Sequence, residues 1–309
     1  MRIAFLGTPP FAVPTLEALL RAGHELACVV AQPDRPAGRG QALREPATKA
    51  FARSRGLRVL QPEKVRDGRL ASELEALAPD VLVVVAYGRI LGRDLLELAP
   101  LGALNLHASL LPRWRGSAPI QWALASGDLE TGVTLMRVAE GLDQGDLLLQ
   151  RAVAIDPEDT AQSLHDRLSV LGAEVTVEGL ARFASGRLTP VRQDERAATQ
   201  ARMLEKEDGR LDFALKASVL ASRLRAFTPW PGVFTVLGGR LLKVHAAKVQ
   251  PPAGLAPGEA RATAEGLLVG CGGDSALLLL EVQLEGRRRI AAAEFVKGQP
   301  FPEGTVLGR

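Results

Sequence analysis

Apolar residues in the first half of the chain alternate between short continuous runs and runs at helical spacing. Residues 2–6 form an apolar strand, and residues 80–86 form a continuous apolar run, which is typical of a strand buried on both faces of a parallel sheet. Residues 13–22 carry apolar side chains at helical spacing and stop at a glycine. Further strands are predicted at 25–31, 58–60, 104–107, 133–138 and 147–155, and helices at 71–77, 117–125 and 160–184. This alternation predicts an α/β fold with a Rossmann-like, doubly wound parallel sheet.

The pattern changes in the last third of the chain. Apolar periodicity lapses after residue 186, one more helix is predicted at 213–227, and a Pro-Trp-Pro-Gly turn follows at 229–232. Short strand-like runs then alternate with glycine at 233–237, 241–249, 266–269 and 276–284. We therefore expect a catalytic domain at 1–187, a linker at 188–205 and a smaller OB-like β-barrel domain at 206–309.

Composition describes an ordinary globular protein. The chain has 309 residues, of which 47% are hydrophobic and 24% charged, so disorder is excluded and a sizeable core is expected. Its two cysteines lie far apart in sequence, which argues against a disulfide framework and a cysteine-rich zinc site. The N-terminus is interpreted as a strand rather than a signal peptide, and there is no apolar run of membrane-spanning length. A cytoplasmic, monomeric protein is expected, with no membrane partner.

Arginine outnumbers lysine 31 to 7, and Asn105 is the only asparagine in the chain. Heat adaptation and a GC-rich genome both produce this bias, and the sequence does not separate these two causes. The net charge is +3, and the whole basic surplus lies in residues 203–309, because the rest of the chain carries equal numbers of basic and acidic residues. This surplus is too small to establish a nucleic-acid partner by itself.

The first strand-turn-helix segment excludes one common class of enzyme. Its turn reads Gly7-Thr-Pro-Pro and lacks the second and third glycines of a dinucleotide-binding loop. A nicotinamide-dependent oxidoreductase is therefore disfavoured.

A polar pair ends one of the predicted strands. Asn105 and His107 are two residues apart, so their side chains project from the same face of the strand. Carboxyl ends of strands are where open α/β sheets bind ligands. An amide that stabilises an oxyanion and an imidazole that handles a proton would suit acyl chemistry there; the alternative is a polar pair bonded to neighbouring backbone.

A second candidate is the loop Gly141-Leu-Asp-Gln-Gly-Asp146. Its Asp143 could orient an imidazole and stabilise its charged form, although Asp and Gly also build ordinary turns. Two acids are too few to hold a hard cation, so no metal is expected.

These segments carry a specific resemblance. NLHASLLPRWRGSAPIQWAL (105–124), GVTLM (132–136) and GLDQGD (141–146) resemble the folate-dependent formyltransferases, as do RIAFLGTPPFAVP (2–14), QPDRPAGRG (32–40) and LRAFTPWPG (224–232). The resemblance covers essentially the whole chain. Within the family it is closest to members that transfer a formyl group from 10-formyltetrahydrofolate to the α-amino group of methionine on initiator tRNA.

The resemblance also implies roles for single residues. Asn105, His107 and Asp143 match the family's catalytic residues, and Ser109, Leu110, Leu111 and Pro112 match its folate-binding turn. The run around 84–90, which contains Tyr87, is expected to supply an apolar wall for the folate.

RNA contacts are expected in three places. The basic loop at 33–49 contributes Arg35, Arg39, Arg44 and Lys49; the segment after the folate-binding turn contributes Arg113 and Arg115; and the C-terminal domain contributes Arg287, Arg288 and Arg289. For the loop and the arginine run, the alternative is a solvated surface.

Two other functions stay open. A formyltransferase acting on an amino sugar nucleotide would share the same three polar residues but would not need a basic loop or a basic C-terminal domain. A non-catalytic RNA-binding protein on the same scaffold would be favoured by loss of any of the three, and none is lost.

Overall fold

The computed structural model describes residues 1–37, 42–298 and 300–308. The chain divides into two compact units. Unit 1 comprises Met1–Pro119, Glu130–Ala154 and Ser163–Arg202, and unit 2 comprises Ile120–Leu129, Ile155–Gln162 and Met203–Arg309. The two short segments Ile120–Leu129 and Ile155–Gln162 therefore pack with the C-terminal residues, whereas the sequence places residues 1–187 in one domain.

Unit 1 is built on a seven-stranded sheet with the order β10-β9-β7-β6-β1-β2-β5. The strands are β1 (Arg2–Gly7), β2 (Glu25–Val30), β5 (Val59–Leu60), β6 (Val81–Val85), β7 (Ala103–His107), β9 (Glu130–Arg137) and β10 (Leu147–Ala154). The chain moves outward from β1 to β2 and β5 on one side and returns to β6 and β7 on the other. The change of direction beside β1 creates the position where doubly wound sheets bind ligands, at the carboxyl ends of the strands.

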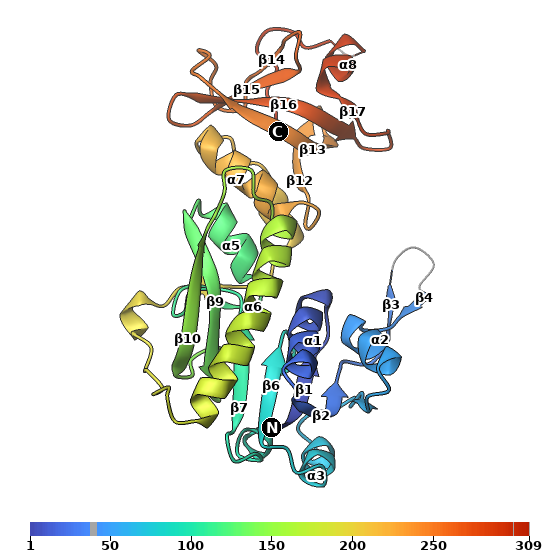
Figure 1. Ribbon diagram of the computed structural model, residues 1–309. Coiled ribbons are helices and arrows are strands. Elements are labelled where there is room, and N and C mark those ends of the chain that lie inside the picture. The colour runs from blue at the N-terminus through green and yellow to red at the C-terminus, as the bar shows by residue number, and fades with distance from the viewer. Residues whose placement is uncertain (38–41, 299, 309) are drawn as a thin grey trace. The chain divides into compact units, whose positions relative to one another are not determined.

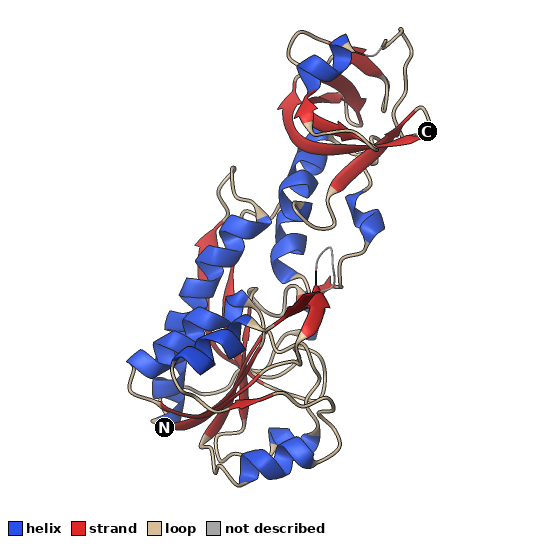
Figure 2. Cartoon of the chain, turned by 90° about the vertical axis from the view of Figure 1, so that its right-hand side faces the viewer, coloured by secondary structure: helices blue, strands red, loops and turns tan. Residues whose placement is uncertain are grey.

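Helices cover both faces of this sheet, as Figures 1 and 2 show. They are α1 (Val13–Arg21), α2 (Ala47–Ser54), α3 (Arg69–Glu75), α4 (Arg93–Leu96) and α6 (Ala161–Ala184), with a 3-10 turn at Pro10–Ala12. Helix α1 has a proline in its first turn and is followed by Gly23, whose φ of 78° is the left-handed conformation that ends a helix. The doubly wound α/β fold predicted from the sequence is confirmed.

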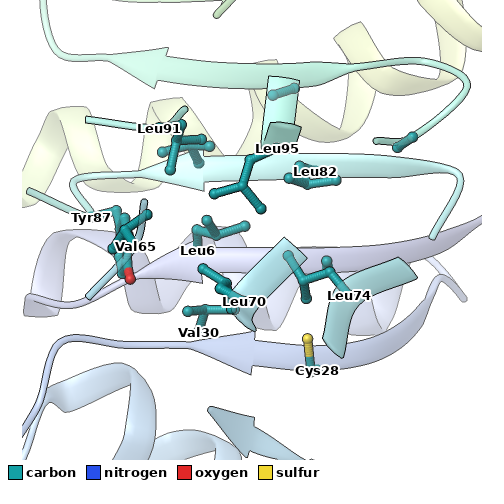
Figure 3. Packing of buried hydrophobic residues seen from close by; sticks show 14 residues of the cluster. Leu6, Cys28, Val30, Val65, Leu70, Leu74, Leu82, Tyr87, Leu91 and Leu95 are labelled. Carbon is teal, nitrogen blue, oxygen red and sulfur yellow. The ribbon is translucent and has the colours of Figure 1, made fainter. Parts of the chain in front are cut away.

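The core between the sheet and helices α3 and α4 is continuous. Leu6 and Leu82 project from neighbouring strands toward Leu70 and Leu74 of α3 and Leu95 of α4 (Figure 3). All five side chains are at most 1% exposed. Strand β6, with the sequence VLVVV, is buried along its whole length, as its continuous apolar run predicts. This packing holds the carboxyl ends of β1, β6 and β7 at one rigid edge.

The sheet is not entirely parallel, which corrects the prediction in one respect. Strand β9 is antiparallel to β7, and β10 is antiparallel to β9. Parallel neighbours need a crossover of a dozen or more residues, whereas β9 and β10 are joined by a short loop that contains Asp143. The end of β9 pairs with the start of β7, Arg137 opposite Leu104, and the loop that follows folds back so that Asp143 lies beside His107 at the carboxyl end of β7.

Residues 188–202 also differ from the expected linker. They form a strap along unit 1, in which Val191 pairs with Leu147, and β11 (Gln200–Ala201) pairs in parallel with β8 (Arg115–Gly116). Apolar periodicity is absent here because backbone pairing, rather than the apolar face of a helix, attaches the segment to unit 1. We refer to residues 188–202 as the strap.

Two strands and the start of a helix lie in the segment 33–49, which was interpreted as a basic loop. β3 (Arg35–Ala37) and β4 (Ala42–Arg44) form an antiparallel hairpin, and α2 begins at Ala47. The predicted RNA-binding residue Arg39 lies outside the described residues.

Unit 2 contains an antiparallel sheet in the order β12-β13-β16-β15-β14, with β17 paired to β16. Its strands are β12 (Val233–Leu237), β13 (Arg240–Gln250), β14 (Ala260–Ala262), β15 (Leu267–Cys271), β16 (Ser275–Leu284) and β17 (Ile290–Ala291), and its helices are α5 (Pro119–Ala125), α7 (Ala217–Phe227) and α8 (Ala292–Lys297). The expected C-terminal β domain is thus an antiparallel sheet. Among the described residues, no helix is both long and apolar enough to cross a bilayer.

Candidate active site

His107 and Asp143 meet at the carboxyl end of β7. The Nδ1 atom of His107 lies 3.5 Å from Oδ2 of Asp143, and the two side chains are only 7% and 11% exposed. On the other side of the ring, Nε2 of His107 lies 2.8 Å from the carbonyl oxygen of Trp114. The imidazole is therefore held between a carboxylate and a backbone carbonyl.

Asn105 lies two residues before His107 on the same strand. Leu106, between them, faces α6, because a Cβ at Gly172 of that helix would lie 2.5 Å from Cδ2 of Leu106. The alternation of a strand then directs Asn105 and His107 to the opposite face. Asn105 is half-buried.

The Asp143 loop has an unusual backbone. Asp143 has a φ of 52°, in the left-handed region that Asp tolerates better than most residues. Two residues later, a Cβ at Gly145 would lie 1.7 Å from the carbonyl oxygen of Arg137, so only glycine fits there. The backbone N–H of Gly116 donates to Oδ2 of Asp143 over 2.9 Å and fixes the carboxylate that faces His107.

The Ser109–Pro112 turn is held by a buried threonine. Thr134 Oγ1 donates to the carbonyl of Ser109 over 2.6 Å and accepts from the N–H of Leu111 over 3.1 Å. Gln150 Nε2 donates to both Leu111 O and Thr134 Oγ1. Backbone polar groups of Ser109 and Leu111 are thereby hydrogen-bonded within the protein, whereas Leu110 and Pro112 remain partly exposed. The turn presents an apolar edge.

A hollow of about 440 Å³ opens in unit 1, next to the segment that follows β6. Its lining residues are Glu63, Lys64, Val65, Arg66, Asp67, Arg89 and Ile90. Arg89 and Ile90 follow β6, whose last residues pair with β7, so the hollow belongs to the same edge of the sheet as His107. Its walls combine three cationic and two anionic side chains with the apolar Val65 and Ile90.

The structure corrects the expected role of Arg115. Its side chain is 2% exposed, and the guanidinium donates to Gln193 and to Glu195 of the strap. A buried, fully engaged arginine does not reach RNA. Its neighbour Arg113 is exposed, and its guanidinium stacks over the Trp114 ring at 4.9 Å.

The other predicted RNA-binding residues differ in their exposure and in whether they form ion pairs. Arg35 and Arg44 are exposed on the β3–β4 hairpin, and Arg287 and Arg288 are exposed after β16. Lys49 is only 15% exposed and binds both carboxylate oxygens of Asp34, while Arg289 is paired with Glu281.

Three residues that position the site were not found from the sequence: Thr134, Gln150 and Gln193. Each is a neutral polar residue in a strand or strap, and its importance depends on contacts between distant segments. A weak signal was available for Thr134, which lies in the GVTLM segment of the resemblance.

A metal centre has no support within the described residues, where no group of three or more His, Cys, Asp or Glu side chains could hold an ion.

A carboxamide, an imidazole and a carboxylate at the edge of a doubly wound sheet, beside an apolar turn, define a group-transfer enzyme of the formyl transferase class. The chain belongs to the formyl transferase family: residues 1–180 match the family's N-terminal domain and residues 203–300 its C-terminal domain. It is 64% identical over 303 residues to the methionyl-tRNA formyltransferase of Anaeromyxobacter dehalogenans (strain 2CP-1 / ATCC BAA-258), which covers 96% of this chain and 97% of that protein.

Other relatives with the same name are similarly complete. The methionyl-tRNA formyltransferase of Myxococcus xanthus (strain DK1622) is 51% identical over 98% of this chain and 97% of its own length. That of Koribacter versatilis (strain Ellin345) is 49% identical over 100% and 99%, respectively.

Solved structures share the fold at lower identity. An N-formyltransferase from Helicobacter canadensis, in complex with folinic acid and dTDP-3-aminofucose, has a TM-score of 0.67 at 17% identity and covers 90% of this chain and 98% of its own. Glycinamide ribonucleotide transformylase 1 from Symbiobacterium toebii has a TM-score of 0.54 at 26% identity, over 63% and 94%.

Proposed function

We infer that the protein transfers a formyl group from 10-formyltetrahydrofolate to the α-amino group of methionine on initiator tRNA, which produces formylmethionyl-tRNA for the start of translation. The observation that carries this inference is similarity over the whole chain to methionyl-tRNA formyltransferases, at 49–64% identity in the three relatives above. The arrangement of His107 and Asp143 beside Asn105 supports this inference, because an amide, an imidazole and a carboxylate suit acyl transfer.

The reaction joins an amine to a formyl carbon and expels a folate nitrogen. The amine nitrogen attacks the formyl carbon, the carbonyl oxygen becomes an oxyanion, and collapse of this intermediate breaks the bond to N10 of the folate. The amine loses one proton, and N10 gains one. An enzyme for this step must stabilise the oxyanion and move the proton.

Asn105 would donate its amide N–H to the developing oxyanion. A neutral donor fixed on a strand is already oriented, so little reorganisation is needed when the charge appears. Its half-buried position at the carboxyl end of β7 is accessible to a ligand from the edge of the sheet.

His107 would carry the proton at Nδ1. The carbonyl of Trp114 only accepts hydrogen bonds, so Nε2 of His107 carries a hydrogen, and a neutral ring has its lone pair at Nδ1. A proton taken up at Nδ1 faces the carboxylate of Asp143, which stabilises the imidazolium. Asp143 thus acts on the charged form of the ring.

We place the folate co-substrate at the edge beside these residues. When bound, it supplies the activated formyl group. The partly exposed Leu110 and Pro112, with the run that contains Tyr87, would contact its flat ring system. Lys64, Arg66 and Arg89 in the neighbouring hollow would attract its carboxylates.

The RNA side of the reaction is assigned to exposed basic residues. Arg35 and Arg44 of the hairpin, together with Arg113, are proposed to contact the end of the tRNA that carries methionine. Residues 206–309 are proposed to act as a tRNA-binding domain through Arg287 and Arg288. The enzyme is proposed to act as a monomer in the cytoplasm, where charged initiator tRNA is used.

One assay tests this function against the alternative sugar substrate. The purified protein is incubated with 10-formyltetrahydrofolate labelled in the formyl group and with either methionyl initiator tRNA or an amino sugar nucleotide. Label on the methionine of the tRNA is the expected result. Label on the sugar alone would replace the proposed substrate, and label on neither would contradict formyl transfer.

A further inference from the structure

The loop that carries Asp143 is held by a residue from a distant part of the chain. Gln193 lies in the strap and is 4% exposed. Its Nε2 donates to the carbonyl of Asp143 over 2.9 Å and to the carbonyl of Gly145 over 2.7 Å. One amide group therefore binds the loop backbone on both sides of Gln144.

The other end of the Gln193 amide is equally engaged. Its Oε1 accepts from Nε of Arg115 over 3.0 Å and from Nη2 over 2.8 Å. A guanidinium only donates and a carbonyl only accepts, so this environment allows a single orientation of the amide. The side chain makes four hydrogen bonds, in which Nε2 donates twice and Oε1 accepts twice.

Arg115 completes the connection. It is 2% exposed, and its two terminal nitrogens form a fork with the carboxylate of Glu195, at 2.8 and 2.9 Å. The hydrogen bond from Arg115 holds the pKa of Glu195 below its usual value. The next residue, Gly116, donates its N–H to the carboxylate of Asp143. Strand β8 thus holds Asp143 in two ways. Arg115 binds Gln193, which binds the backbone carbonyl of Asp143, and Gly116 binds the Asp143 carboxylate directly.

We propose that Gln193 is a positioning residue for formyl transfer, which holds Asp143 against Nδ1 of His107 without touching either substrate. This rests on the proposed function. The contact between Asp143 and His107 measures 3.5 Å, so a small displacement of the loop separates the two groups. Because Asp143 has a left-handed backbone, the loop needs external support to keep this conformation.

The first test replaces Gln193 with Ala. The expected result is a fall in kcat of about tenfold to a hundredfold, which is typical when a reacting group moves by about 1 Å. The KM values for the folate and for the tRNA should stay near those of the wild type, because Gln193 contacts neither. Gln200→Ala is the matched control, since Gln200 lies exposed on β11 of the same strap. A rise in KM at unchanged kcat, or an equal loss in the control, would overturn the proposal.

A second variant separates the loop from the arginine. Gln193→Glu retains acceptor oxygens for Arg115 but removes both N–H donors to the loop. It should lose kcat as Gln193→Ala does, and it covers the case in which the alanine variant fails to fold. Wild-type kcat in Gln193→Glu would show that the loop contacts are dispensable and would overturn the proposal.

The decisive measurement is a double-mutant cycle with Asp143→Asn. If Gln193 acts through Asp143, adding Gln193→Ala to Asp143→Asn should lower kcat no further. A full multiplicative loss would assign Gln193 an independent structural role and refute the inference. An inactive wild type would instead contradict the proposed function, so the two failures are distinguishable.

Discussion

His107 donates Nε2–H to the carbonyl oxygen of Trp114, and this single contact decides which nitrogen of the ring can take part in proton transfer. The ring is nearly buried, and Nδ1 is left facing Asp143 at 3.5 Å. A second proton can therefore enter only on the side of the carboxylate. The orientation of the ring is fixed by the backbone of the segment that follows the Ser109–Pro112 turn.

Asp143→Asn should lower kcat strongly while it leaves the fold intact. The amide keeps the shape of the carboxylate and can still accept from the N–H of Gly116, but it no longer stabilises a charged imidazole. We expect kcat to fall by about two orders of magnitude or more, as for loss of general acid–base function. Steady-state kinetics and a folate-binding titration measure the effect. Unchanged turnover would remove the carboxylate charge from the mechanism.

Asn105→Ala should reduce turnover through a different route. The loss of one oxyanion donor typically lowers kcat by about 10²- to 10³-fold. Binding of the folate, measured by fluorescence or calorimetry, should change little, because the amide is needed only once the oxygen becomes charged. Asn105→Asp is the informative comparison: it has a similar shape but repels an oxyanion, and it should be at least as slow. Activity at the wild-type level in either variant would exclude Asn105 from the reaction.

The local sequence pattern was sufficient to predict the strands that carry the site. The continuous apolar run of β6 and the spacing of Asn105 and His107 depend on strand geometry alone, and both strands are found where they were expected. The boundaries of α1 also follow from Pro14 and Gly23, which act within one turn of the helix.

Contacts between distant segments were not predictable in the same way. Arg115 was expected to contact RNA because it follows the folate-binding turn directly, and only the strap, some 80 residues later in the chain, buries it. Gln193 carries no periodic or charge signal, and its four hydrogen bonds exist only once three segments meet. The antiparallel direction of β9 and β10 likewise depends on how the chain closes the sheet.

The contacts of Asp34, the residue before β3, give a prediction about the pH dependence of stability. Lys49 and Gln61 donate to the carboxylate of Asp34, and these hydrogen bonds, that of Lys49 first, hold the pKa of Asp34 below its usual value. A carboxyl with a lowered folded-state pKa binds protons more readily when unfolded, so its stabilising effect is present above about pH 4 and is lost as the pH falls through the folded value.

Asp34→Asn should therefore be less stable than the wild type at pH 7, and the difference should shrink as the pH falls below about 4. Urea unfolding followed at a series of pH values measures it. Glu75→Gln, at an exposed position on α3, serves as the control and should show a much smaller difference. If the difference in the free energy of unfolding between wild type and Asp34→Asn does not change with pH, the charge of Asp34 does not contribute to stability.

Tyr87→Phe should stabilise the protein. The Tyr87 side chain is 1% exposed, its hydroxyl has no hydrogen-bond partner among the described residues, and burial raises its pKa. Removal of an unsatisfied buried hydroxyl should raise the free energy of unfolding by about 1 kcal/mol. Thr48→Val is the contrast, because Thr48 Oγ1 donates to the carbonyl of Gly7 over 2.7 Å, and its loss should destabilise by about 1–3 kcal/mol. Chemical denaturation measures both, and a destabilised Tyr87→Phe would indicate that the hydroxyl is bonded in solution.

Replacement of both Arg287 and Arg288 by Ala should weaken tRNA binding and reduce its salt dependence. Both residues are exposed, whereas Arg289 is paired with Glu281, which raises the pKa of Arg289 and engages its charge. Each phosphate contact contributes about 0.7 to 0.9 to the slope of log K against log salt concentration. The double variant should therefore lose about 1.5 from this slope, and Arg289→Ala should lose less. Filter binding or fluorescence anisotropy over a range of salt concentrations measures the slope. An unchanged slope in the double variant would move the RNA contact away from this segment and leave the hairpin arginines as the basic surface to test next.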